Sequence, residues 1–398
     1  MRHFRKLSFV ALLGVSAGFF ACGDDDSIVR TRPDGGTMEA SAGDAPVEAS
    51  GPDTLSCGVS IPATYESPSF ATNAKAELDF KARVLAIGDK MKTAEGAMPV
   101  AVTTADLNAI FTAGVPSLRT VATAFAQATV DTYFMQFGDA VGKTWTPADA
   151  DAEGGAPAGG RYDSASIVSA TGVDLREASE KILVNGSLYN YALLVAGGVI
   201  TEATIDRLVA LFGATPKFAN SADDAGADGD ALIAEYASKR DNKVPGTPGP
   251  YRKIARALRA ARAAAAAPAD KCRADLDAAL KIFFLEWEKT SYLTVIYYLN
   301  QAATNATAAP AKGQLALHSY GEALGFAQSF KGIPQDRRKI TDAQIDSLLL
   351  RIGATTPYKL AVPALVSDRV VAFNGAYSDI GAVYGLTPTD IEDAKKAY

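Results

Sequence analysis

The chain has 398 residues, of which 48% are hydrophobic and 21% are charged, and its formal net charge is −6 at pH 7. The first six residues carry three positive charges, and residues 22–56 hold eight acidic residues against two arginines, so residues 57–398 carry only about −3. A folded part so close to neutral has no overall field to attract nucleic acid or an anionic membrane, and we exclude nucleic acid as a partner.

Residues 1–21 have the pattern of an export signal. Basic residues precede an apolar run from Leu7 to Phe20, and the small residue Ala21 stands directly before Cys22. This order is typical of a bacterial lipoprotein signal peptide, in which the thiol of Cys22 is acylated and becomes the new N-terminus. Two or three acyl chains give stable anchoring that a single chain does not. We therefore expect an outer-membrane lipoprotein of the cell envelope. The alternative is an ordinary signal peptide followed by a chance cysteine.

Residues 22–56 form a different kind of segment. They are rich in Gly, Ala, Ser, Pro and Asp and have no apolar periodicity. Such a segment cannot bury enough apolar surface to offset its chain entropy, and its excess of acidic residues makes it self-repelling. We predict a disordered acidic linker between the membrane and a folded domain that spans 57–398.

The domain is predicted to be all-helical. Phe80, Val84, Ile87 and Met91 repeat at helical spacing, similar apolar stripes recur over 118–137 and 175–195, and no long run of alternating strands appears. A long central helix is predicted to begin near Cys272 and to continue through YLTVIYYLN, where apolar residues occupy every face. Segments rich in Gly and Pro over 146–160, 220–230 and 243–250 are predicted to be surface loops.

Two cysteines remain after Cys22, namely Cys57 and Cys272. In an oxidising envelope we expect them to form a disulfide that ties the start of the domain to the central helix, and two free buried thiols are the alternative. Two cysteines are too few for a zinc site built from cysteines.

An internal repeat gives the clearest indication of architecture. ITEATIDRLVALFGATPKF (200–218) matches ITDAQIDSLLLRIGATTPYK (340–359) at a constant offset. In each copy a threonine is placed to cap a helix, and Gly213 or Gly353 is placed to end it. We predict a duplication of about 173–219 and 311–359, so that two related helical bundles pack into one domain.

One pair of side chains stands out as a candidate metal site. His318 is the only histidine after His3, and Glu322 lies one helical turn further on. With no second histidine, a metal site would need oxygen ligands from elsewhere, such as Glu286 or Glu288. The alternative is a structural role, with His318 hydrogen-bonded to Glu322 or to a backbone carbonyl in a helix interface. No H-E-x-x-H or G-x-S-x-G motif is present, so the sequence assigns no catalytic residue.

A basic helical face is predicted over 250–267, with Arg252, Arg256 and Arg259 on one side. Aromatic residues that could stack on nucleic-acid bases are nearly absent between them. We interpret this face as solvated, with the acidic loop over 223–230 as its intramolecular partner.

Five stretches in order resemble a bacterial lipoprotein family of unknown function whose members look like relatives of the imelysins. They are EKILVNGSLYNYAL from Glu180, LFGATPKF from Leu211, YASKRDN from Tyr236, LEWEKTSYLTVIYYLN from Leu285 and HSYGEALGF from His318. The resemblance spans about 64–353 and implies an all-helical, imelysin-like fold of two bundles in the envelope.

The resemblance also implies a link with metal chemistry. Imelysins are associated with iron acquisition and were once classed as metallopeptidases through a G-x-H-x-x-E motif. This chain departs from that motif, since Ala316 stands where the glycine belongs and Glu322 comes one residue late. The favoured hypothesis is a membrane-anchored binding or interaction protein for an unknown protein or small ligand, accessory to iron or haem acquisition. The alternatives are an imelysin-type metal-dependent envelope hydrolase and a purely structural envelope protein.

Overall fold

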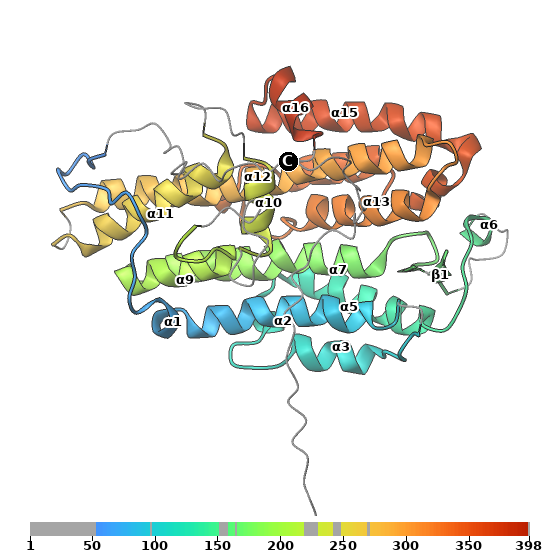
Figure 1. The fold of residues 1–398 in the computed structure, drawn as a ribbon, viewed down its shortest axis with the longest axis horizontal. Helices are drawn as coiled ribbons and strands as arrows, with labels where there is room; N and C mark the ends of the chain where they lie inside the picture. The colour runs from blue at the N-terminus through green and yellow to red at the C-terminus, as the bar shows by residue number, and fades with distance from the viewer. Residues whose placement is uncertain are drawn as a thin grey trace, which may run out of the picture. The chain divides into compact units, whose positions relative to one another are not determined.

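The computed structural model describes residues 53–95, 98–150, 158–163, 165–218, 230–241, 248–268 and 271–396. The predicted signal peptide, Cys22 and nearly all of the linker lie outside these residues, as do most of the three predicted loops. The fold is mostly helical, with 67% helix and 3% strand, which confirms the predicted all-helical class (Figure 1).

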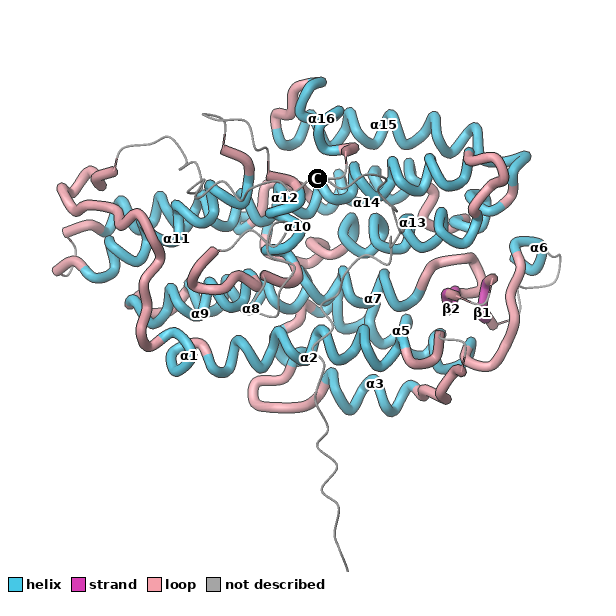
Figure 2. Tube along the Cα trace, in the orientation of Figure 1, coloured by secondary structure: helices cyan, strands magenta, loops and turns pink. Residues whose placement is uncertain are grey.

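The first half contains short and long helices in alternation. They are α1 (Phe70–Asn73), α2 (Lys75–Lys92), α3 (Thr104–Phe111), α4 (Leu118–Val121), α5 (Ala124–Ala140), α6 (Pro147–Ala150), α7 (Leu175–Leu183), α8 (Asn190–Ala196) and α9 (Glu202–Phe212). Strands β1 (Gly160–Tyr162) and β2 (Ser166–Val168) pair antiparallel, with Arg161 opposite Ile167. They lie near the N-terminus of α7 (Figure 2).

The second half is built around the long central helix. The helices are α10 (Ile233–Lys239), α11 (Pro250–Ala266), α12 (Arg273–Thr307), α13 (Gly313–Gln328), α14 (Asp342–Ile352), α15 (Val366–Tyr384) and α16 (Pro388–Ala394). Short 3₁₀ turns cover Gln335–Arg337, Pro357–Ala361 and Pro363–Leu365. The predicted central helix is confirmed as α12, which has 35 residues and packs against α10, α11, α13, α15 and α16.

The helices stack in rows that bring distant parts of the chain together. In Figure 1, α2 and α3 lie in the lowest row, α7 and α9 above them, then α11 to α13, and α15 with α16 at the top. Helix α7 contacts α2 and α5 on one side and α13 on the other. The interface between α7 and α13 therefore lies in the interior of the domain.

Two of the predicted continuous helices are interrupted. The helix predicted over 118–137 is divided into α4 and α5. The side chain of Thr123 caps α5 by accepting a hydrogen bond from the backbone N–H of Ala126. The helix predicted over 175–195 contains a π-helical turn (Val184–Tyr189) that separates α7 from α8. Within that turn Asn185 accepts a hydrogen bond from Trp287 Nε1 at 2.9 Å and donates to Ser291 and Ser329, so the buried amide of Asn185 is satisfied.

The two predicted repeat segments form matching helices. Thr201 begins α9 and Thr341 begins α14, and each threonine side chain accepts a hydrogen bond from a backbone N–H in the first turn. Both helices end at a glycine with a positive φ, 97° for Gly213 and 74° for Gly353. A left-handed residue at this place lets the backbone close the last turn, and glycine adopts it without a Cβ clash. The duplication itself stays a prediction.

Candidate functional site

Two glycines on α13 allow α7 to approach closely. A Cβ at Gly321 would lie 2.8 Å from the Cβ of Asp174, and a Cβ at Gly325 would lie 2.7 Å from the Cβ of Lys181. Any larger residue at either place would push the helices apart. The close packing sets the charged side of α7 directly against the turn of α13 that carries His318.

His318 lies among three carboxylates at this interface. Its Nδ1 is 3.3 Å from Asp174 Oδ2 and 3.7 Å from Glu177 Oε1, and its Nε2 is 3.6 Å from Glu322 Oε1. Burial would lower the pKa of His318, but the charge of Glu177, the hydrogen bond to Asp174 and the charges of Asp174 and Glu322 outweigh it and raise the pKa to about 10. The imidazole is therefore a cation at neutral pH.

Lys181 supplies a second cation in the same place. Its Nζ lies 3.0 Å from Glu177 Oε2, 3.2 Å from Glu180 Oε1 and 3.4 Å from Glu322 Oε2, and its side chain is only 5% exposed. Burial favours the neutral amine, yet the three carboxylates raise the pKa of Lys181 well above its usual value. The ring of Tyr236 lies 5.6 Å from the ammonium, and its hydroxyl donates to Glu322 Oε2 at 3.2 Å.

Arg176 and Glu95 complete this group of side chains. Arg176 Nε lies 2.7 Å from Glu95 Oε2, and one of its terminal nitrogens lies 2.5 Å from Glu177 Oε1. Burial together with the charges of Asp174 and Glu177 raises the pKa of Glu95 to about 7, although Arg176 opposes the shift. Burial opposes ionisation of Glu177 too, but Arg176, Lys181 and His318 outweigh it and lower the pKa of that carboxyl.

We call this group the His318 cluster. It consists of five carboxyl side chains and three side chains that carry positive charge, namely Glu95, Asp174, Arg176, Glu177, Glu180, Lys181, His318 and Glu322. The sequence predicts that His318 and Glu322 lie on one face of a helix, and in the structure the two side chains lie 3.6 Å apart. The members of the cluster from α7 were not predicted, although Asp174, Glu177 and Lys181 recur at helical spacing where the first stretch of the resemblance begins.

The oxygen ligands that the sequence suggested lie elsewhere. Glu288 accepts hydrogen bonds from the backbone N–H groups of Lys339 and Ile340 and from the hydroxyl of Tyr384. Glu286 lies 3.5 Å from Lys253 Nζ. The expectation that Glu286 or Glu288 would join His318 is wrong, because α12 turns both carboxylates toward other elements and α7 supplies the acids instead.

The donor atoms near His318 have the spacing of a metal site. Ligand atoms of Glu177, His318 and Glu322 all lie within 4.8 Å of one another. His318, however, already has a carboxylate partner, since its Nδ1 lies 3.3 Å from Asp174 Oδ2. The ammonium of Lys181 also contacts both glutamates. As the side chains stand, they do not fit a metal ion.

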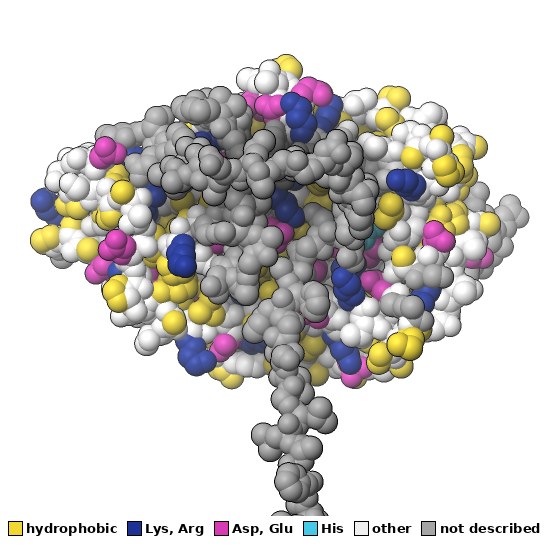
Figure 3. Space-filling model, in the orientation of Figure 1, with side chains coloured by type: hydrophobic (Ala, Val, Ile, Leu, Met, Phe, Trp, Pro, Cys, Tyr) yellow, Lys and Arg dark blue, Asp and Glu magenta, His cyan; other side chains and the backbone are white. Residues whose placement is uncertain are grey.

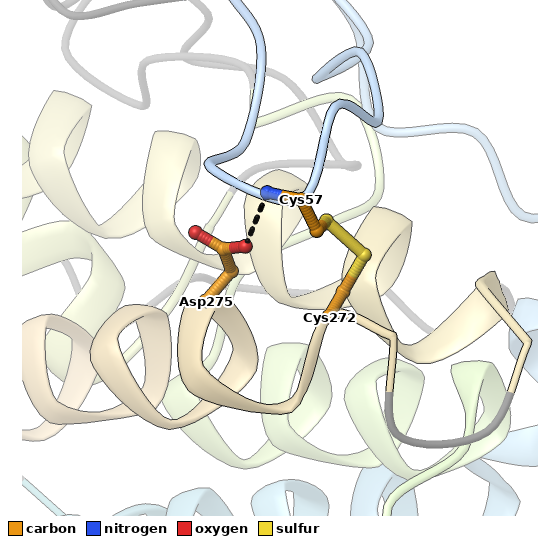
Figure 4. A group of neighbouring side chains, drawn as sticks. All are labelled: Cys57, Cys272 and Asp275. Carbon is orange, nitrogen blue, oxygen red and sulfur yellow. Dashed lines mark hydrogen bonds between the residues drawn. A yellow bond between two sulfur atoms is a disulfide. The ribbon is translucent and has the colours of Figure 1, made fainter.

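The predicted disulfide between Cys57 and Cys272 is confirmed. The two sulfurs are 2.03 Å apart, and the bond joins the first described residues to the start of α12 (Figure 4). Beside it, Asp275 accepts hydrogen bonds from the backbone N–H of Cys57 and from both the N–H and the hydroxyl of Ser56. Asp275 and the two sulfurs also lie close enough to suggest a metal site, but sulfurs bonded to each other offer no thiolate.

The segment that leads from the first described residue through Cys57 to the start of α1, residues 53–69, we call the strap. Its second attachment is Asp206 of α9, a carboxylate with no exposed surface. Asp206 accepts hydrogen bonds from Tyr65 at 2.6 Å and from Ser67 at 2.7 Å, as well as from Asn73 and Arg262. Four donors satisfy the buried charge, so the strap is fixed at both ends.

Two hollows lie beside the strap and not at the His318 cluster. The first, of about 230 Å³, lies between strap residues such as Tyr65 and α11. The second, of about 340 Å³, lies beside Asn73. Both are lined by Glu202 and Arg262, whose side chains pair at 3.1 Å. A ligand pocket of drug size begins near 300 Å³, so only the second reaches that range.

The basic face of α11 is paired within the domain. Arg252 lies 2.6 Å from Asp241, which is not the partner that the sequence suggested. Most of the acidic loop over 223–230 lies outside the described residues. On the visible face in Figure 3, acidic and basic side chains are interspersed.

Comparison of the chain with models of known protein families, with curated proteins and with solved structures finds no match. Among the helices of the described residues, none combines the length and apolar character that crossing a membrane requires.

Proposed function

We propose that the chain is a lipid-anchored envelope protein whose helical domain acts by binding a partner and not by catalysis. The disulfide between Cys57 and Cys272 is the observation that carries this proposal. Structural disulfides persist in oxidising compartments such as the bacterial periplasm and the cell surface. The first cysteine of this disulfide, Cys57, lies where the predicted acidic linker joins the folded domain. It is only 35 residues after Cys22, the cysteine proposed to carry the lipid.

The state of His318 supports binding over hydrolysis. Asp174, Glu177 and Glu322 surround His318, and the ammonium of Lys181 lies 3.4 Å from Glu322 Oε2. Both side chains of the candidate pair are therefore already engaged with groups of opposite charge. The imelysin-type hydrolase, which would use His318 as ligand and Glu322 as base, is therefore the weaker candidate.

The resemblance to relatives of the imelysins extends the proposal to an accessory role in iron or haem acquisition. In this role the domain contacts a protein or small ligand of the uptake system at the cell surface. The hollows beside Glu202 and Arg262 offer a starting place for such a contact, because strap residues line part of both.

Acylation of Cys22 is the test of the anchor. The wild-type protein and the Cys22→Ser variant are expressed in a Gram-negative host, and the N-terminal peptide of each is analysed by mass spectrometry after membrane fractionation. We expect wild type to begin at an acylated Cys22 and to sediment with membranes, and Cys22→Ser to lose both properties.

The matched control for this experiment is Cys57→Ser. It removes a thiol of the same chain without touching the signal, so it should keep the acyl group and the membrane fraction. A wild-type protein that begins elsewhere, or that carries no lipid at residue 22, would contradict the proposal.

A further inference from the structure

The His318 cluster is arranged like a cation site with a cation already inside it. Three carboxylates, from Glu177, Glu180 and Glu322, point at one position between α7 and α13. The ammonium of Lys181 fills that position at 3.0 to 3.4 Å from all three. An ammonium is a compact point charge, and three acidic oxygens around it reproduce the surroundings that a hard metal ion prefers.

We infer that Lys181 is the resident cation of this site, that it keeps the wild-type protein free of metal there, and that removing its side chain opens a divalent-cation site. The ligands of the opened site are Glu177, Glu180 and Glu322, with His318 beside them. This inference concerns the chain's own charged groups and does not depend on the proposed function.

The packing around Lys181 holds α7 and α13 close together and places an aromatic ring beside the ammonium. The residue at 325 must be glycine, because a Cβ there would lie 2.7 Å from the Cβ of Lys181 and 2.8 Å from the carbonyl oxygen of Ala178. The ring of Tyr236 lies over the ammonium, and a cation against an aromatic face is stabilised when both are buried. The stem and the charge of Lys181 are therefore both accommodated.

Removal of the ammonium creates the conditions for metal binding. The carboxylates would remain close together and nearly buried, since Glu177 and Glu322 are only 3% and 2% exposed. Buried carboxylates that lose their counter-charge are strongly destabilising until another cation replaces it. Because carboxylate oxygens suit Mn²⁺, and ligand atoms of Glu177 and Glu322 lie within 4.8 Å of each other, Mn²⁺ alone is the probe.

The experiment compares wild type with Lys181→Ala and Lys181→Met, all purified through a chelator. Binding of Mn²⁺ is measured from the loss of the free-ion electron paramagnetic resonance signal, and the melting temperature is measured with and without Mn²⁺. We expect no binding to wild type at this site. Lys181→Ala should bind one Mn²⁺ and gain about 4 °C in melting temperature when the ion is about 100-fold above its dissociation constant.

Lys181→Met is the matched control, because methionine removes the charge but keeps most of the volume. It should lose stability as Lys181→Ala does, yet gain nothing from Mn²⁺. If Lys181→Ala does not fold, the double variant with Asp174→Asn removes one carboxylate of the cluster that is not a ligand of the opened site, and it serves in its place. A third change, Glu322→Gln in either background, should abolish the Mn²⁺ response.

Three results would overturn the inference. Wild type could bind one Mn²⁺ that Glu322→Gln removes, which would mean that the lysine does not exclude metal. Lys181→Ala and its double variant could show no Mn²⁺ response, or Lys181→Met could respond equally. The last result would place the ion away from the position of the ammonium.

Discussion

Loss of the disulfide between Cys57 and Cys272 should destabilise the domain by a predictable amount. The bond closes a loop with a sequence separation of 215 residues. In the chain-entropy model the crosslink restricts the unfolded chain, and a loop of this length corresponds to about 5 kcal/mol at 25 °C. With about 2.1 cal/mol/K of unfolding entropy per residue and roughly 340 folded residues, the melting temperature should fall by about 7 °C.

The assay is guanidinium unfolding and scanning calorimetry of the double variant Cys57→Ala/Cys272→Ala beside oxidised wild type. The double change avoids leaving a free thiol. Asp275→Asn is the matched control, since it weakens the hydrogen bonds to Ser56 and Cys57 but leaves the loop closed. It should cost much less than the double variant. A loss below about 1 kcal/mol for the double variant, or an equal loss for Asp275→Asn, would refute the loop-closure reasoning.

Two further predictions concern charged groups in the interior. Because the folded pKa of His318 is about 10, its contribution to the free energy of unfolding is fully present below about pH 6.5 and is lost as the pH rises through 10. Imidazole proton resonances in NMR spectra of residues 57–398 should therefore not titrate between about pH 5 and pH 8.5, and a midpoint near 6.5 would refute the cluster's charge state. Asp206→Asn should cost about 1–3 kcal/mol in urea unfolding, because Tyr65 and Ser67 lose a charged acceptor while Arg262 keeps its pair with Glu202. Its repeat counterpart Asp346 is paired at the surface with Lys331, so Asp346→Asn should stay within about 0.5 kcal/mol, and equal losses would contradict the assignment.

Apolar spacing was sufficient to predict most of the helices. Phe80, Val84, Ile87 and Met91 are all fully buried along α2, as their period indicates. Threonine and glycine caps located α9 and α14 correctly, because a cap is a local property of a few neighbouring residues. The two cysteines predicted the disulfide because only one pairing was open to them after Cys22.

The candidate site was harder to predict because it depends on contacts between distant segments. Asp174 and His318 are 144 residues apart in the sequence. The residues around either position carry no pattern that predicts contact between α7 and α13. Gly321 and Gly325, one helical turn apart, are the signal that was missed, since small residues at that spacing permit a close helix approach. The π-helical turn at 184–189 was also missed, because its apolar pattern differs little from that of an ordinary helix.

The disulfide also has a mechanical consequence for a domain held on a membrane tether. Tension on the linker would reach the protein at the strap, whose hydrogen bonds to Asp206 could be broken one after another. The pulling force, however, reaches Cys57 before it reaches those hydrogen bonds. There the disulfide transfers it to the start of α12, the helix that most of the second half packs against. The hydrogen bonds between the strap and Asp206 would therefore carry little of the pulling force. The force would instead act on the whole domain through its central helix.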